Sequence, residues 1–242
     1  MDTEHDLRTH LDSVRERIAA AARRAGRQPE EIELVAVSKT VAPERIAALA
    51  RLGVRYFGEN RVEEASAKLP ALQALLGPEA YASKRWCLIG HLQSRKAAQA
   101  VGLFDEIHSL DSLGLAQRLD RLAAAHGRAL PVLIEVNVSG EASKYGLPLA
   151  QPAALYGAIE AMLTLGHLEI QGLMTVAPLV ADPEEVRPVF CRLRELRDDL
   201  ARRWPARPWH HLSMGMSDDF EVAVEEGATM VRLGRALFGP RN

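Results

Sequence analysis

The sequence predicts an α/β protein folded as a single (β/α)8 barrel of the TIM type, with an extra helix at its N-terminus. Short apolar runs rich in β-branched residues alternate with amphipathic segments, and the chain holds eight strand candidates. Strands joined by helices lie parallel, because a parallel pair needs a long crossover connection. Eight such units suit a closed barrel. The alternative is a doubly wound open sheet, which is disfavoured because no GxGxxG turn follows the first strand.

The first three elements show the pattern most clearly. Apolar residues at helical spacing predict an N-terminal helix over residues 5–26. A short β-branched run predicts the first strand over 32–38. The amphipathic helix over 42–53 has Pro43 near its start and Gly53 at its end, as helices prefer.

The rest of the chain continues this alternation. The other strands are predicted from short apolar runs over 55–58, 85–90, 106–110, 130–139, 168–176, 209–215 and 230–234. The helices between them are predicted from amphipathic segments over 59–69, 94–102, 112–127, 149–164, 183–204 and 218–227. Residues 69–84 are the least regular segment and predict a helix followed by a surface loop. No repeat or linker interrupts the chain, so residues 1–242 are predicted to form one domain.

Composition excludes several classes of function. The formal net charge is −2, which gives no electrostatic basis for nucleic-acid binding. No apolar run reaches the length of a membrane span, and the N-terminus has no signal-peptide core. The two cysteines, Cys87 and Cys191, form no CxxC motif. These features predict a cytoplasmic protein with reduced thiols and no membrane or nucleic-acid partner.

Polar residues follow all eight predicted strands, and in a barrel these positions form one rim. The function of such barrels lies at the C-terminal ends of the strands. The last two corners, in "LSMGMSDDF" and "RLGRALFG", place small and hydroxyl residues before helices. Loops after the seventh and eighth strands often hold phosphate, since helix N-termini offer free N–H groups. The alternative is that Ser213 and Ser217 only cap the helix.

Lys39 ends the first strand, in "LVAVSKT", and predicts a reactive amine. The ordinary pKa of lysine is about 10.4, and desolvation or a neighbouring cation would lower it. A neutral amine forms imines with carbonyl groups. An imine-forming lysine beside a phosphate site predicts pyridoxal 5′-phosphate as the cofactor. The alternative is a rim lysine that extends into solvent.

Taken together, several motifs resemble the pyridoxal phosphate homeostasis protein family, and the match runs from about residue 7 to the end. The motifs that carry the resemblance are "LVAVSKT", "FGENRVEEASAK", "LIGHLQSRK", "HSLDS", "VLIEVNVSGEASKYG", "GLMTVAP" and "LSMGMSDDFEVAVEEGATMVRLGRALFG". The last block is the most specific. The resemblance implies a barrel like the N-terminal domain of alanine racemase.

The resemblance also implies a cofactor site. Lys39 would hold pyridoxal 5′-phosphate as an imine, Arg232 would face the pyridine nitrogen, and Asn60 and Met214 would lie near the ring. The residues implied around the phosphate are Ser213, Ser217, Gly234 and Arg235. Because a guanidinium does not readily release a proton, Arg232 should leave the ring nitrogen unprotonated and weaken the ring as an electron sink. Gly234 and Arg235 would contact the phosphate chiefly through their backbone N–H groups. Position 235 is arginine where many members of the family carry threonine, so a side-chain hydroxyl contact there would be lost, whereas a backbone contact would survive.

The histidines near strand ends do not predict a metal site. His91, His108, His210 and His211 lack HxxxH spacing, and no acidic partner is evident beside them in the sequence. The prediction is that no metal is bound and that these residues pack the barrel mouth.

Three functions are compatible with this site. The first is a non-catalytic carrier that stores pyridoxal phosphate and transfers it to pyridoxal phosphate-dependent apo-enzymes. The second is an amino-acid racemase, which needs two proton-transfer groups; Lys144 and Tyr145 are candidates for the second. The third is a Schiff-base aldolase without a cofactor. The carrier is favoured, because nothing places a second group opposite Lys39 and no second domain follows the barrel. For the same reason a monomer is predicted.

Overall fold

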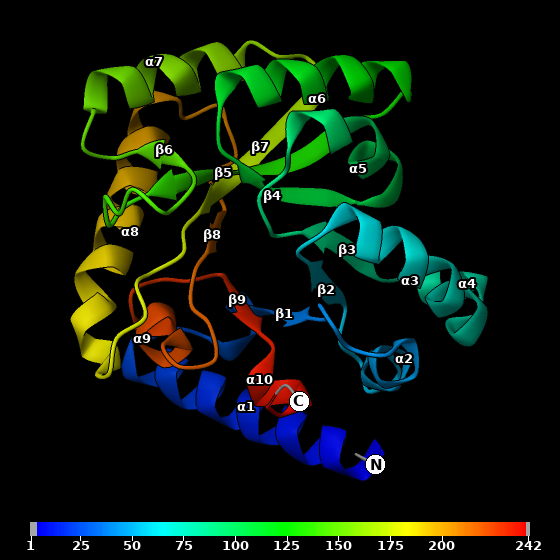
Figure 1. The fold of residues 1–242 in the computed structure, drawn as a ribbon. Coiled ribbons are helices and arrows are strands. Elements are labelled where there is room, and N and C mark those ends of the chain that lie inside the picture. Colours follow the sequence, from blue (N-terminus) through cyan, green and yellow to red (C-terminus); the bar gives the residue numbers. More distant parts are fainter. Residues whose placement is uncertain (1–3, 241–242) are drawn as a thin grey trace.

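The computed structural model describes residues 4–240 and shows a closed barrel of parallel strands surrounded by helices (Figure 1). The barrel strands are β1 (Glu33–Val37), β2 (Tyr56–Glu59), β3 (Arg85–Leu88), β4 (Glu106–Leu110), β5 (Leu130–Asn137), β7 (Leu168–Met174), β8 (His211–Ser213) and β9 (Met230–Leu233). Their order is β4-β3-β2-β1-β9-β8-β7-β5, and pairing of β4 with β5 closes the sheet. The barrel prediction is confirmed and the open-sheet alternative is wrong. The predicted domain range, 1–242, extends beyond the described residues at both ends.

The helices follow the predicted pattern, and the observed elements differ from the predicted ones in two places. They are α1 (Glu4–Arg24), α2 (Pro43–Arg51), α3 (Val62–Leu76), α4 (Pro78–Ala82), α5 (Ala97–Leu103), α6 (Leu113–Ala125), α7 (Pro152–Leu163), α8 (Arg187–Arg203), α9 (Phe220–Glu225) and α10 (Arg235–Phe238). The first difference is that α3 continues through Pro70 and is followed by the short helix α4. The second is β6 (Leu147–Pro148), a two-residue strand on β5 that the sequence pattern did not reveal.

Helix α1 lies outside the repeating units and packs against α2, α9 and α10 (Figure 1). The apolar residues that predicted it, including Leu7, Leu11 and Val14, are buried. Its polar side also makes contacts: Arg17 donates to Glu221 at 3.0 Å, and His10 Nδ1 lies 3.1 Å from the carbonyl of Leu237. The extra N-terminal helix therefore braces the segment that carries the last two strand ends.

The barrel has an apolar jacket and an interior that holds both apolar and polar side chains. The main hydrophobic cluster lies between the strands and the helices, whereas Val35, Leu133, Met174 and Met230 form a separate small cluster. Contacts between strands that are not neighbours, such as His108 on β4 with Ser213 on β8, cross the interior. Glu106, Glu135 and Arg232 on the barrel strands are also buried, and a buried charge must find a partner or shift its pKa.

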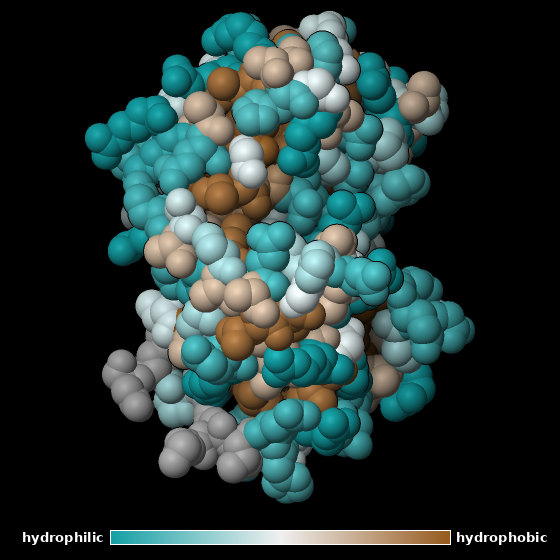
Figure 2. Space-filling view, turned by 90° about the vertical axis from the view of Figure 1, so that its right-hand side faces the viewer, coloured by the Kyte–Doolittle hydropathy of each residue, from teal (hydrophilic) through white to brown (hydrophobic). Residues whose placement is uncertain are grey.

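None of the helices within residues 4–240 combines the length and the hydrophobicity that crossing a bilayer requires. Figure 2 shows a face covered largely by hydrophilic side chains, with hydrophobic ones confined to interrupted patches.

Candidate functional site

Five of the predicted site residues line one pocket at the C-terminal end of the barrel. They are Lys39, Ser217, Arg232, Gly234 and Arg235, which come from the ends of β1, β8 and β9. The pocket has a volume of about 570 Å³. This lies within the range of about 300–1,000 Å³ that is usual for small-molecule sites. The parallel strands thus bring together side chains that are far apart in sequence.

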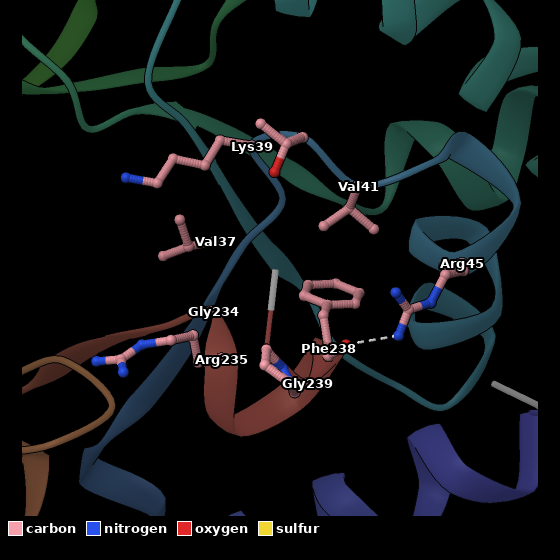
Figure 3. Close-up of a pocket in the computed structure, with 10 residues that line it drawn as sticks. Val37, Lys39, Val41, Arg45, Gly234, Arg235, Phe238 and Gly239 are labelled. Atoms are coloured by element: carbon pink, nitrogen blue, oxygen red, sulfur yellow. Dashed lines mark hydrogen bonds between the residues drawn. The ribbon is translucent and has the colours of Figure 1, made fainter. Parts of the chain in front are cut away.

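A second, smaller pocket of about 230 Å³ adjoins the first and shares Lys39 with it (Figure 3). Its wall includes Phe238, whose carbonyl accepts a hydrogen bond from Arg45 Nη2 at 2.7 Å. In Figure 3 the side chains of Lys39 and Arg235 extend in the same direction, away from Phe238 and Arg45. Both residues also line the larger pocket.

Arg232 is the buried cation of the larger pocket. Only 5% of its surface is exposed, and its Nη1 donates to the carbonyl and to the hydroxyl of Ser213 at 2.6 and 2.9 Å. Its Nη2 donates to the carbonyl of Thr175 at 2.7 Å. Burial lowers the pKa of Arg232 to about 10, while Glu135 and Asp219 oppose this shift. Arg232 therefore remains charged at neutral pH, in one fixed orientation.

Ser213 connects Arg232 to a chain of hydrogen bonds inside the barrel. Its hydroxyl lies 3.5 Å from Nδ1 of His108, and Nε2 of His108 lies 3.2 Å from Oε2 of Glu106. Burial alone would raise the pKa of Glu106, but the hydrogen bond from His108 lowers it, so Glu106 is an ionised acceptor. Nε2 of His108 is therefore the donor to Glu106. Arg232, Ser213, His108 and Glu106 thus form one continuous hydrogen-bonded chain across the barrel.

This arrangement revises one expectation. His108 does have an acidic partner, Glu106, so the expectation that no acid accompanies the histidines is wrong. Cys87 is also there: its Sγ lies 3.9 Å from Glu106, and ligand atoms of all three residues lie within 4.8 Å of one another. Burial raises the pKa of Cys87 well above its usual range, which keeps a thiol rather than a thiolate. The prediction that no metal is bound stays a prediction.

The two corner loops at the expected phosphate position are tied together. The hydroxyl of Ser217 accepts from the N–H of Ala236 at 3.3 Å, and Arg235 forms an ion pair with Asp218. Gly215 has a φ of 92°, and a Cβ there would lie 2.6 Å from the Cβ of Ala223. Glycine is therefore required at this turn. Both loops are held at the pocket by contacts that the chain itself supplies.

Three predicted site residues do not line this pocket. Ser213 is fully buried beneath it, with its hydroxyl on Arg232 and His108. Met214 is fully buried in the outer hydrophobic cluster. Asn60 is half-buried, and its Oδ1 is buried without a hydrogen-bond partner among the described residues. An unsatisfied amide oxygen is a group that a ligand could pair.

Lys144 lines the same pocket as Lys39, whereas Tyr145 lies outside it. Nζ of Lys144 donates to the carbonyl of Val176 at 3.1 Å. The ring of Tyr145 stacks on His91 with centroids 3.7 Å apart. Of the two candidates for a second proton-transfer group, only Lys144 is therefore placed at the pocket.

Glu135 and Lys68 are two buried ionisable residues that sequence reasoning missed. Glu135 lies on β5, and its Oε2 is buried without a partner among residues 4–240. Burial and the nearby charge of Asp111 raise its pKa to about 7, although Arg232 opposes this shift. Lys68 lies on α3 behind the end of β1. The spacing of Glu64 and Lys68 on one helix was the available signal, because residues four apart are neighbours there.

Comparison with known proteins agrees with this geometry. Residues 9–242 match the family model "Alanine racemase, N-terminal domain". The pyridoxal phosphate homeostasis protein of Aquifex aeolicus is 45% identical over 232 residues, which cover 96% of each chain. That of Escherichia coli is 39% identical and covers 98% of each chain. The solved structure of PipY from Synechococcus elongatus with pyridoxal phosphate bound has a TM-score of 0.82 and 37% identity, covering 96% of this chain and all of the other. The chain belongs to the pyridoxal phosphate homeostasis protein family, within the alanine racemase N-terminal domain fold.

Proposed function

We propose that this chain binds pyridoxal 5′-phosphate through Lys39 and acts in its homeostasis, storing and transferring it without catalysis. The observation that carries the proposal is that Lys39 and Arg232 line one pocket between the two corner loops. Its relatives carry the name of this function, and PipY binds this cofactor. When bound, pyridoxal phosphate supplies an aldehyde that condenses reversibly with amines.

The residues of the pocket have separate proposed roles. Lys39 supplies the amine, and Arg232 presents a guanidinium to the ring nitrogen. Because Ser213 and Thr175 fix Arg232, the guanidinium needs no reorganisation on binding. Arg235 would assist the phosphate through charge, but its ion pair with Asp218 offsets part of that charge.

The rest of the proposed phosphate and ring contacts follow from position. Ser217 and Gly234 line the pocket and are proposed to hold the phosphate. Asn60, with its unsatisfied Oδ1, is proposed to face the ring. Met214 and Ser213 lie below the surface, so we propose that they support the site from behind.

The proposal extends to the state and the partners of the protein. We propose a single-domain monomer in the cytoplasm that transfers its cofactor to pyridoxal phosphate-dependent apo-enzymes. Light scattering of the purified protein tests whether it is a monomer. Activation of an apo-enzyme by the loaded protein, compared with activation by an equal amount of free cofactor, tests the transfer.

The experiment is an absorption spectrum of the protein with added pyridoxal phosphate, before and after borohydride, followed by peptide mapping. We expect an imine band and a pyridoxyl group on Lys39. Lys39→Ala should abolish the reducible adduct and retain phosphate-anchored binding, whereas Lys96→Ala, on the surface near Glu63, should resemble the wild type. A full adduct in Lys39→Ala would refute the assignment.

The same preparation tests the racemase alternative. Lys144 at the pocket is the observation that makes this test necessary. The loaded protein is incubated with single enantiomers of amino acids, and the products are separated by chiral chromatography. We expect no interconversion; turnover that Lys144→Ala abolishes would show a racemase.

A further inference from the structure

Behind the strand end that carries Lys39, one lysine joins three oxygen atoms. Lys68 on α3 is only 8% exposed. Its Nζ donates to the carbonyl of Ser38 at 2.8 Å, to Oε1 of Glu59 at 2.9 Å and to Oε1 of Glu64 at 2.8 Å. All three donor positions of the ammonium are therefore used, as burial of a lysine requires.

These contacts hold the chain on both sides of Lys39. On one side, the hydroxyl of Ser38 donates to Oε1 of Glu59 at 2.7 Å, the same oxygen that Lys68 binds. On the other side, the N–H of Thr40 donates to Oε1 of Glu64. Lys68 thus couples two carboxylates, and each carboxylate holds one neighbour of Lys39.

The backbone between these contacts is strained. Thr40 has a φ of 63°, a left-handed conformation that β-branched residues avoid. It is the one non-glycine residue with positive φ within residues 4–240. Strained residues persist only where surrounding contacts hold them, and they gather at functional sites. The hydrogen bond from Thr40 to Glu64 is such a contact.

Stability alone does not explain the buried charges. Burial raises the pKa of Glu59, and its Oε2 has no partner among the described residues. Burial would also raise the pKa of Glu64, but the hydrogen bonds from Lys68 and Thr40 lower it below its ordinary value. A buried ion pair is often no more stabilising than apolar residues of equal size, and its best-attested use is to fix a structure.

We propose that Lys68, Glu59 and Glu64 form a clamp that fixes the segment Ser38–Thr40, so that the side chain of Lys39 emerges into the cofactor pocket. The inference rests on the proposed function, in which Lys39 is the attachment point. The three residues are positioning residues, and none of them lines the two pockets that contain Lys39. Lys68 and Glu64 contact the backbone of Ser38 and Thr40, and Glu59 contacts the hydroxyl of Ser38.

The test compares three variants on one helix. Glu64→Ala removes the acceptor for Thr40, and Glu64→Gln keeps an acceptor oxygen. Glu63→Ala is the matched control, because Glu63 is exposed and its side chain forms a surface ion pair with Lys96. Two quantities are measured for each with added pyridoxal phosphate: the borohydride-reducible adduct on Lys39, and the total cofactor bound by equilibrium dialysis.

We expect Glu64→Ala to lower the equilibrium constant for adduct formation about tenfold, with a smaller change in total binding. Glu64→Gln should recover most of the loss, and Glu63→Ala should match the wild type. Adduct formation in Glu64→Ala within about twofold of the wild type would overturn the clamp. A proportional loss of both quantities that Glu64→Gln does not recover would also overturn it.

Two further results are decisive. If Glu64→Ala does not fold, Ser38→Ala removes only the hydroxyl on Glu59 and should lower adduct formation about threefold; an unchanged value would overturn the clamp. If the wild type forms no adduct on Lys39, the proposed function fails and this inference with it. A normal wild type with unaffected variants refutes the clamp alone.

Discussion

Glu135 should make the stability of the protein depend on pH in a direction opposite to that of most carboxylates. Its ordinary pKa is 4.5 and its pKa in the fold is about 7, so the folded state binds more protons between these values. The free energy of unfolding therefore falls as pH rises through this window. The difference between these two pKa values, at about 1.36 kcal/mol per pKa unit, corresponds to about 3 kcal/mol for full ionisation. Between about pH 5 and about pH 8 the expected loss is about 2.5 kcal/mol.

Glu135→Gln should remove this dependence, because glutamine has the shape of the protonated acid and does not ionise. The assay is urea unfolding of the cofactor-free protein at both pH values, for the wild type, Glu135→Gln and the exposed control Glu160→Gln. The change in unfolding free energy between the two pH values should differ by about 2.5 kcal/mol between Glu135→Gln and the wild type. The control should follow the wild type. An identical pH dependence in Glu135→Gln would show that Glu135 titrates normally and would refute the reasoning.

The remaining predictions concern packing and the support of Arg232. Gly90→Ala should destabilise the protein by about 1–3 kcal/mol, because its Cβ would lie 2.3 Å from the carbonyl oxygen of Asn60. In α5, a Cβ added at Gly102 would have its nearest neighbour at 3.9 Å, so Gly102→Ala should be neutral or stabilise the protein by up to about 1 kcal/mol. Thermal melting distinguishes the two variants, and equal melting temperatures would contradict the argument. Ser213→Ala removes one of two acceptors for Arg232 Nη1 and should weaken cofactor binding about threefold to tenfold. An absorption titration measures this, and an unchanged affinity would mean that the backbone carbonyl suffices.

Local patterns predicted the barrel because each strand and helix carries its own periodicity. The site followed from topology: in a barrel, residues after parallel strands share one rim, which is why Lys39 and Arg232 were expected together and lie together. Helix α3 was predicted too short because Pro70 lacks an N–H and usually ends a helix. In this case packing against α2 and α5 maintains the helix.

The interior of the barrel could not be predicted in the same way. Whether Ser213 faces the pocket or the barrel interior depends on strand register, which short strands do not specify by pattern alone. Ser213 reaches His108 from β8 across the barrel, although the other partner of His108, Glu106, lies two residues away on the same strand. The charges that act on Glu135 come from Arg232 on β9 and from Asp111 in the loop after β4. Lys68 resembles a solvated helix residue until the end of β1 is placed against it.

The pairing of the first strand with the last has a consequence for how the protein acquires its site. Residues of β1 align with those of β9, Glu33 with Met230 and Ala36 with Leu233. A ribosome releases β1 long before β9, and pairing of segments so distant in sequence is slow. Until β9 has been synthesised and has paired with β1, Arg232 is not in place near Lys39, and one edge of β1 is unpaired. A nascent chain therefore carries Lys39, the proposed attachment point, for most of its synthesis without the complete pocket around it, and the pocket is completed only when β9 joins the barrel.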